Sequence, residues 1–276
     1  MNGTLKLPAP TWFVGCGNMG GAILDGWRAG GLDLSPVTVI RPSGTPVEGT
    51  RTVTGFADAG PPPKLVVLAF KPQKLEEVAP ELRKWLSART VIVSLLAGVE
   101  AASLRQRFPG VGAVVRAIPS LPVAVRRGVT GLYSTDAGQQ TQQELNDLFS
   151  ALGFAMWMAD ESKLAALGSV AGAGPAYVAR FVAALTKAGV KRGLTEEIAA
   201  VIARETVLGT AWMAATTGEG MESIARRVAS PKGTTEAGLA VLDGEGVLDD
   251  LIAATINAAF SRGAELAEEA RAAVQA

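Results

Sequence analysis

Short apolar runs alternate with helix-like segments through the first half of this 276-residue chain. The pattern predicts strands at residues 11–14, 37–40, 65–70, 90–95 and 113–117. Residues 65–70 are continuously apolar, which is typical of a strand buried on both faces of a sheet. Helical spacing occurs at 21–29, 73–86 and 99–108, and a weaker strand and helix follow at 128–133 and 141–152. This alternation predicts an α/β fold with a doubly wound, mostly parallel sheet.

Strand signals fade after about residue 160, and alanine-rich helical segments follow at 175–192, 195–217, 234–242 and 247–273. Gly193 can end one helix, and Thr195 is well placed to cap the next. We therefore expect two domains, with the sheet in residues 1–160 and an all-helical domain in 161–276.

Several of the predicted helices are apolar on more than one face, and such helices must be buried. A domain of about 115 residues has too little interior to bury several of them alone. We therefore expect the helical domain to complete its core in an interlocked homodimer. The alternative is a compact monomeric bundle.

A glycine motif, Gly15-Cys16-Gly17-Asn18-Met19-Gly20, follows the first predicted strand and opens a helical pattern. In this strand–turn–helix context, Gly15 permits a tight turn, Gly17 lets the backbone approach a pyrophosphate and Gly20 allows close packing. The start of the helix then faces the phosphates with free N–H groups. The motif predicts a dinucleotide coenzyme.

Arg41-Pro42-Ser43 follows the second predicted strand, where dinucleotide folds discriminate the adenosine ribose. The next acid along the chain is Glu48, so a carboxylate for the ribose hydroxyls of NAD is missing from this turn. An arginine with a hydroxyl suits a 2′-phosphate, so we expect NADPH to be preferred over NADH. The alternative is that Arg41 is a solvated surface residue.

Other predicted strands end in small or rigid segments at the edge where ligands bind in open α/β sheets. Lys71 and Pro72 follow the third predicted strand, and Lys71 is either a coenzyme contact or a solvated side chain. Ala97-Gly98 forms a second close-approach turn, and the two prolines of residues 118–122 stiffen a loop at the same edge.

Two segments of the helical half are also candidates for a functional role. Residues 172–177 predict a glycine-rich turn followed by proline at a helix start. Ser230-Pro231-Lys232-Gly233-Thr234-Thr235 leads into another helix, and its hydroxyl and N–H groups could bind a small carboxylate. Ordinary helix capping is the alternative.

The composition excludes several kinds of catalytic chemistry. The chain has no histidine, which removes imidazole acid–base catalysis, histidine-based triads and histidine-ligated zinc. We expect no metal site, and a coenzyme is left to carry the difficult step. The only cysteine, Cys16, forms no internal disulfide. Lys plus Arg equals Asp plus Glu at 26 each, so the chain has no net charge that would attract nucleic acid or an anionic membrane. We see no membrane-spanning run or signal peptide and expect a cytoplasmic protein.

The ordered set of motifs resembles that of the pyrroline-5-carboxylate reductase family. The resemblance spans nearly the whole chain, and its segments are residues 15–20, 71–73, 97–99, 116–119, 172–177, 188–190, 206–209 and 230–235. It implies an N-terminal Rossmann domain, a helical dimerisation domain and often a larger ring of dimers. The implied reaction is hydride transfer from NADPH, or alternatively NADH, to the C=N carbon of 1-pyrroline-5-carboxylate, which gives L-proline.

The resemblance also implies site residues. The family's Ser-Pro-Gly-Gly-Thr-Thr segment makes Ser230, Gly233 and Thr234 carboxylate ligands. Its last threonine, Thr235, contacts the ring nitrogen and is the expected catalytic residue. The expected coenzyme-binding residues are Gly15, Gly17, Asn18, Met19, Gly20, Arg41, Ser43, Ala69, Lys71, Pro72, Ala97 and Gly98.

The chain departs from the family pattern at five positions. Ala171 and Ala173 replace serines, Ile118 replaces methionine, Ser120 replaces asparagine and Lys232 replaces glycine. These changes leave open the reduction of a different small cyclic imino acid, or a catalytically silent sensor that binds NADPH or proline. Oxidation of a β-hydroxyacid is a further alternative, but Lys187 and Lys191 lack the accompanying asparagine.

Overall fold

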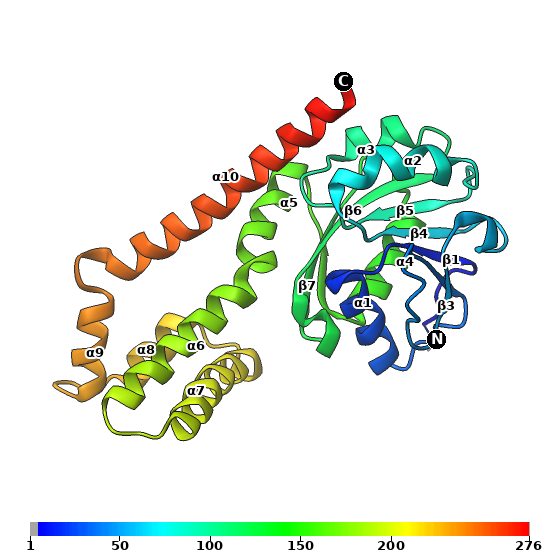
Figure 1. Cartoon of the computed structure of the whole chain (residues 1–276). Coiled ribbons are helices and arrows are strands. Elements are labelled where there is room, and N and C mark those ends of the chain that lie inside the picture. The colour runs from blue at the N-terminus through cyan, green and yellow to red at the C-terminus, as the bar shows by residue number, and fades with distance from the viewer. Residues whose placement is uncertain (1–4, 276) are drawn as a thin grey trace. The chain divides into compact units, whose positions relative to one another are not determined.

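The computed structural model describes residues 5–275, and an eight-stranded sheet forms the centre of their N-terminal part (Figure 1). The strands are β1 (Thr11–Val14), β2 (Val37–Ile40), β3 (Arg51–Val53), β4 (Leu65–Leu68), β5 (Val91–Ser94), β6 (Ala113–Pro119), β7 (Gly128–Tyr133) and β8 (Gly153–Trp157). Their order is β3-β2-β1-β4-β5-β6-β7-β8, and only the β6–β7 pair is antiparallel. The first six positions have the order of a Rossmann fold, which confirms the predicted fold class.

Alternating side chains of the central strands fill two separate cores, one on each face of the sheet. Phe13 and Val67 pack into one core with Trp27 of α1 (Asn18–Ala29). Trp12 and Val66 pack into the other, with residues of α2 (Leu75–Arg83) and α3 (Ala101–Arg107). Because successive side chains of a strand point to opposite faces, continuously apolar strands need cover on both sides. α4 (Gln139–Ser150) shares the first face with α1.

Two strands were not predicted from the sequence. β3 has three residues, none of them buried, so it carries no apolar run. β8 lies at the other edge of the sheet and exposes the side chains of Phe154 and Met156. Both are edge strands: β3 is held by its pairing with β2, whereas Ala155 and Trp157 of β8 also pack against the core that contains Phe13.

The prediction for residues 172–177 is only partly correct. Pro175 lies in the first turn of a helix, as expected, but the segment before it is π-helical up to Gly172 rather than an open turn. α5 (Glu161–Leu167) continues into a π-helical segment, η4 (Gly168–Gly172), and then into α6 (Gly174–Lys191). The glycines adopt helical geometry here, and Ile118 packs against the positions of Gly168 and Gly172. The small residues therefore serve close packing against β6.

The four remaining helices of residues 5–275 are α7 (Glu196–Thr217), α8 (Met221–Val228), α9 (Thr234–Leu242) and α10 (Val247–Gln275), with 3-10 turns η1 (Phe56–Asp58), η2 (Pro72–Lys74), η3 (Leu121–Val125) and η5 (Gly244–Gly246) elsewhere. Three of these helices, α7, α9 and α10, match predicted segments. Thr195 caps α7 by accepting a hydrogen bond from the Ile198 N–H. Gly193 has a φ of +97° in the preceding turn, a conformation that glycine adopts without strain. Sequence reasoning did not find α8.

The chain divides into two compact units. Unit 1 contains residues up to 173 together with those from 259 onward, and unit 2 contains residues 174–258. The C-terminal half of α10 therefore belongs to the same unit as the sheet.

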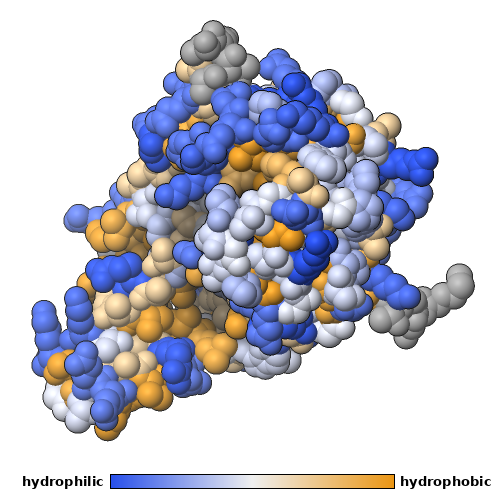
Figure 2. Space-filling view, turned by 45° about the vertical axis from the view of Figure 1, so that its right-hand side comes forward, coloured by the Kyte–Doolittle hydropathy of each residue, from blue (hydrophilic) through white to orange (hydrophobic). Residues whose placement is uncertain are grey.

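Unit 2 carries many exposed apolar side chains (Figure 2). α6 and α7 pack together, with Gly189 against Ala199, but Phe181, Ile202 and Leu208 are each about half exposed in the single chain. Apolar surface of this extent is typical of an interaction face.

By length and composition, α7 is the one helix of residues 5–275 that could cross a membrane, although only 11% of its most apolar window is buried. This finding differs from our reading of the sequence, which found no such run. A single helix of this kind is weak support for a membrane span, because apolar helices of protein interfaces have the same composition.

Candidate active site

The glycine motif forms a tight turn between β1 and α1. Gly15 has a φ of +77°, and a Cβ atom there would lie 2.8 Å from the carbonyl oxygen of Ala69. A Cβ atom on Gly20 would lie 3.0 Å from the Cβ of Ala69. Ala69 follows β4, so it supports the turn from the neighbouring strand. Both glycines and the small alanine are thus required for the close approach of the two strand ends.

The start of α1 is open to a ligand. No atom lies within 4 Å of a Cβ built on Gly17, and no side chain caps the helix. The first turn contains no acidic residue, and the first helical bond runs from the Gly21 N–H to the Gly17 carbonyl. The N–H groups of Asn18, Met19 and Gly20 therefore precede the helical ladder. An open helix start of this kind fits the pyrophosphate of a dinucleotide.

The turn after β2 brings a positive charge to the glycine motif. Arg41 is close enough to oppose electrostatically the effect of burial on Cys16, which raises the pKa of that thiol above its ordinary value. Glu48, the nearest acid in the sequence, forms an ion pair with Arg28 instead. This turn therefore presents a cation whose charge the loop's own acid does not neutralise.

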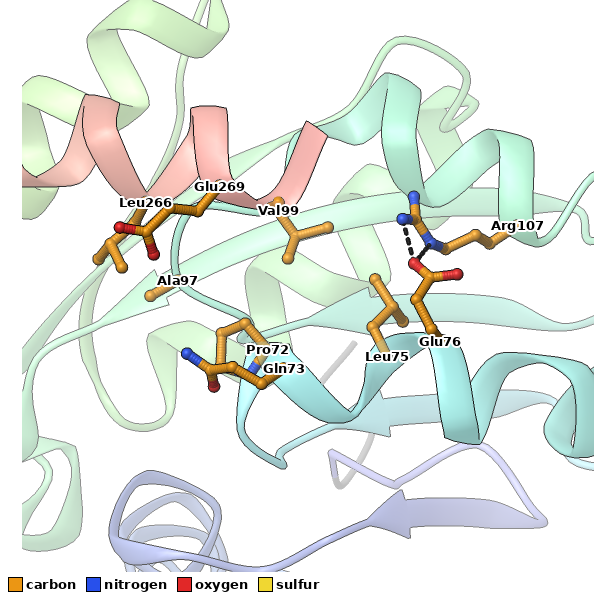
Figure 3. A pocket seen from close by; sticks show the side chains of 10 residues that line it. Pro72, Gln73, Leu75, Glu76, Ala97, Val99, Arg107, Leu266 and Glu269 are labelled. Carbon is orange, nitrogen blue, oxygen red and sulfur yellow. Dashed lines mark hydrogen bonds and ion pairs between the residues drawn. The ribbon is translucent and has the colours of Figure 1, made fainter. Parts of the chain in front are cut away.

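Lys71 and Pro72 follow the end of β4. Lys71 is exposed, and its carbonyl oxygen accepts the N–H of Lys74 at 2.9 Å, which begins η2. Pro72 lines a small cavity of about 100 Å³ with Ala97, Val99 and residues of α2 and α10 (Figure 3). Arg107 and Glu76 also line it and form an ion pair with 2.7 Å between Nε and Oε1. The small cavity is too narrow for a coenzyme, and it lies between η2 and residues 266–270 of α10.

A larger cavity of about 810 Å³ lies within unit 1, next to the start of α1. Three predicted coenzyme residues, Met19, Ala97 and Gly98, line it together with the end of β6. The complete lining is Met19, Leu95, Leu96, Ala97, Gly98, Glu100, Arg116, Ala117, Ile118, Pro119, Glu161, Ser162, Ala165, Gly168, Ser169, Ala173, Ala259, Phe260, Arg262, Gly263, Ala264, Leu266, Ala267 and Arg271. A cavity of this size can hold a drug-sized molecule.

An ion pair is built into the wall of this cavity. Arg116 at β6 and Glu161 at the start of α5 lie 2.7 Å apart between NH1 and Oε1, and only 9% of the arginine side chain is exposed. The same carboxylate oxygen accepts the backbone N–H of Ala101 at 2.8 Å, so it also holds the start of α3. The wall is therefore polar but balanced in charge at this point.

The sequence analysis missed the C-terminal half of α10 as part of this site. A Cβ atom on Gly98 would lie 2.8 Å from the carbonyl carbon of Leu266, and Arg271 forms an ion pair with Glu100 at 2.7 Å. The helical pattern of residues 247–273 identified a helix correctly, but its composition contains no signal that its two halves belong to different units.

The predicted substrate residues lie in unit 2, around the start of α9. The N–H of Gly233 donates to the carbonyl of Ser230 at 2.9 Å, and Ser230 leaves no room for a Cβ on Gly233. Among the described residues, the Thr234 and Thr235 hydroxyls have no hydrogen-bond partner, whereas Thr206 and Thr210 of α7 donate to carbonyls four residues earlier. The two hydroxyls and the uncapped helix start are available to a ligand.

The departures from the family pattern have different structural settings. Ser120 is buried. Its backbone N–H donates to the Val129 carbonyl and its hydroxyl oxygen accepts the Val129 N–H, so it joins β7 to the end of β6. Ala173 lines the large cavity, where the lost hydroxyl changes its surface. Within residues 5–275, no group of three or more histidine, cysteine or acidic side chains is arranged to hold a metal.

Comparison with known proteins identifies the family. A family model described as pyrroline-5-carboxylate reductase dimerisation matches residues 161–266, and one described as NADP oxidoreductase coenzyme F420-dependent matches residues 12–98. The curated pyrroline-5-carboxylate reductase of Pseudomonas aeruginosa is 36% identical over 267 residues, covering 93% of this chain and 96% of the relative. The chain belongs to the pyrroline-5-carboxylate reductase family. The family prediction made from the motifs is confirmed.

Solved structures of the family have the same fold. The pyrroline-5-carboxylate reductase from Coxiella burnetii is 30% identical, with a TM-score of 0.85 over 94% of this chain and 99% of that one. A Plasmodium falciparum pyrroline carboxylate reductase with NADP bound has a TM-score of 0.85 over 95% of this chain and 99% of that one. Its identity is 20%, so this likeness concerns the fold alone.

Proposed function

We propose that this chain catalyses the NADPH-dependent reduction of 1-pyrroline-5-carboxylate to L-proline. The relationship to curated reductases over 93% of the chain supports the reaction. The observation that carries the proposal in the structure is the uncapped start of α1 beside a cavity of about 810 Å³. When bound, NADPH supplies the hydride that reduces the C=N carbon of the imino acid.

The coenzyme-binding residues in this proposal are Gly15, Gly17, Asn18, Met19, Gly20, Arg41, Ser43, Ala69, Lys71, Pro72, Ala97 and Gly98. The N–H groups at the start of α1 hold the pyrophosphate, and Ala97 and Gly98 lie where the cavity receives the reactive end. Arg41 and Ser43 bind the 2′-phosphate of NADPH. The engagement of Glu48 by Arg28 supports NADPH over NADH, because no free carboxylate opposes the phosphate at this turn.

Ser230, Gly233 and Thr234 bind the substrate carboxylate in this proposal, and Thr235 donates its hydroxyl proton toward the ring nitrogen. Within residues 5–275 the hydroxyls of Thr234 and Thr235 have no hydrogen-bond partner, which supports these roles. A cyclic imine is readily protonated, so the residues need only orient two reactants and stabilise the changing charge. The absence of histidine from the chain is compatible with that task.

The proposal also includes the organisation of the protein. Residues 1–160 form the coenzyme domain and 161–276 the helical domain for substrate binding and dimerisation. The dimerisation family model and the exposed apolar residues of unit 2 support a homodimer. A larger ring of dimers, a cytoplasmic location and the lack of membrane or nucleic-acid partners complete the proposal, in keeping with an enzyme of amino-acid synthesis.

Incubation of the protein with NADPH and 1-pyrroline-5-carboxylate tests the activity directly. The nicotinamide absorbance should fall and L-proline should form in equal amount. A six-membered cyclic imino acid serves as the second substrate, because the lost hydroxyl at Ala173 alters the cavity wall. Faster turnover of the larger ring would reassign the substrate, and NADPH binding without turnover of either would indicate a sensor.

Thr235→Ala tests the assigned catalytic residue. Loss of one hydrogen bond to a charged group costs about 1.5–3 kcal/mol, so kcat/KM should fall roughly ten- to hundredfold. Thr217→Ala is a matched control, because its hydroxyl donates to a carbonyl within α7. If Thr235→Ala retains wild-type kcat/KM, the hydroxyl has no part in turnover.

A further inference from the structure

Ser43 presents its hydroxyl in a defined orientation. Its oxygen accepts two hydrogen bonds, one from the Thr45 hydroxyl at 3.0 Å and one from the Thr45 backbone N–H at 3.4 Å. A serine hydroxyl has one proton and two lone pairs. With both lone pairs engaged by the same residue, the proton of Ser43 is left to donate away from Thr45.

The turn that carries Ser43 is rigid. The Gly44 N–H donates to the Arg41 carbonyl at 3.0 Å, and Pro42 fixes φ at the second position of this turn. Gly44 has a φ of +63°, and a Cβ atom there would lie 3.2 Å from Thr54. The direction of the serine hydroxyl therefore depends on Thr45 more than on movement of the backbone.

The charges around this turn favour an anion as the acceptor of that proton. Arg41 lies in the same turn, and its charge acts on Cys16 of the glycine motif. Glu48 is paired with Arg28, so it does not compete for the Ser43 hydroxyl. A phosphate accepts a stronger hydrogen bond than the neutral 2′-hydroxyl that NADH has at the same place.

We propose that Thr45 is a positioning residue that sets the coenzyme preference by aiming the Ser43 proton at the 2′-phosphate of NADPH. Thr45 does not touch the coenzyme; it acts only through Ser43. This inference rests on the proposed function, because it takes the adenosine ribose to lie at the turn after β2.

Thr45→Val tests this role, because valine keeps the shape and the backbone N–H but removes the hydroxyl. We expect the KM for NADPH to rise about three- to tenfold, the effect of weakening one oriented hydrogen bond. The KM for NADH and the kcat with either coenzyme should stay within about twofold, since a neutral ribose hydroxyl gains little from that bond. Thr45→Ser, which restores a hydroxyl, should restore the NADPH preference.

Two controls separate positioning from loosening of the loop. Thr50→Val removes a similar hydrogen bond in the same loop, from Thr50 Oγ1 to the Val47 carbonyl at 2.9 Å, but it is not bonded to Ser43. It should leave the ratio of the two KM values unchanged. In a Ser43→Ala background, Thr45→Val should have no further effect, because its only route to the coenzyme is gone.

The proposal is overturned if Thr45→Val leaves the NADPH preference intact, raises both KM values equally, or acts in the Ser43→Ala background. Direct binding of NADPH and NADH, followed by nicotinamide fluorescence, gives the same comparison without turnover. If the wild-type protein reduces no imino acid, the proposed reaction fails. The binding measurement still decides the role of Thr45.

Discussion

Gly98 lies so close to Leu266 that any side chain at position 98 would clash with it. A Cβ atom on residue 98 would be 2.8 Å from the carbonyl carbon of Leu266, and Gly98 has a φ of +75°. Glu100, two residues after Gly98, forms an ion pair with Arg271, which lies on α10 as Leu266 does. The glycine after β5 therefore serves the packing of α10 in addition to its proposed contact with the coenzyme.

Gly98→Ala should destabilise unit 1 by about 2–5 kcal/mol, the sum of left-handed strain and overpacking against a backbone. Thermal unfolding measures this as a fall in Tm, and the KM for NADPH should rise because the loop and helix move apart. Gly110→Ala is the control, since no atom lies within 4 Å of its added Cβ. Equal Tm values for the two variants would contradict the close packing of Gly98.

The two halves of the Arg116–Glu161 ion pair should differ in their cost of removal. Glu161→Ala leaves a buried guanidinium and the Ala101 N–H without their acceptor, and we expect a loss of about 3 kcal/mol. Arg116→Met retains the volume and leaves a carboxylate that is 28% exposed, so about 1–2 kcal/mol should be lost. Urea unfolding measures both changes.

Glu222→Ala provides a surface control for this pair. Glu222 and Arg226 are 3.7 Å apart and both are well exposed, so the loss should be below about 0.5 kcal/mol. If Arg116→Met cost as much as Glu161→Ala, the ion pair itself, rather than the stranded guanidinium, would be the source of the stability.

The sequence predicted the central fold because its strongest signals are local. β1 and β2 have the bounds that their apolar runs predicted, and the Thr195 cap marks the start of α7. β3 was not predicted because an edge strand without buried residues has no hydrophobic pattern. The turn expected before Pro175 was wrong because Gly168 and Gly172 lie in a π-helical segment, whereas the expected proline at a helix start was correct.

The candidate site could be predicted in part from the sequence, for a related reason. The glycine motif depends on steric rules that hold for any chain, so its turn and the open helix start could be predicted. The contact of Leu266 with Gly98 and the ion pair of Arg116 with Glu161 join segments far apart in the sequence. Nothing in the local pattern of either segment encodes the other, so only the folded structure could reveal them.

Cys16 should be a slow nucleophile at neutral pH. Burial raises the pKa of its thiol above the ordinary value, so the thiolate is scarce, and the nearby Arg41 opposes this shift. Alkylation by iodoacetamide should be slower than for a small free thiol at pH 7, and its rate should still be climbing above pH 9. Arg41→Ala should slow the reaction further by removing the positive charge. A faster reaction in that variant would contradict the electrostatic contact.

Lys232 occupies a backbone conformation that favours glycine. It has a φ of +60° at the third position of a turn closed by the Gly233 N–H and the Ser230 carbonyl. Lys232→Gly removes about 1–2 kcal/mol of left-handed strain and adds about 0.5–1 kcal/mol of backbone freedom in the unfolded chain. The net gain should be about 0.5–1 kcal/mol, or roughly 1–4 °C in Tm.

The bond from the residue 232 N–H to Glu236 Oε2, 2.6 Å long, is retained in that variant because it uses only the backbone of residue 232. Lys232→Ala is the matched control, since it removes the same charge but keeps the Cβ that causes the strain. Only the glycine variant should therefore gain stability, as followed by thermal unfolding. An equal gain in Tm for alanine would assign the effect to the lost charge and contradict the role of backbone strain.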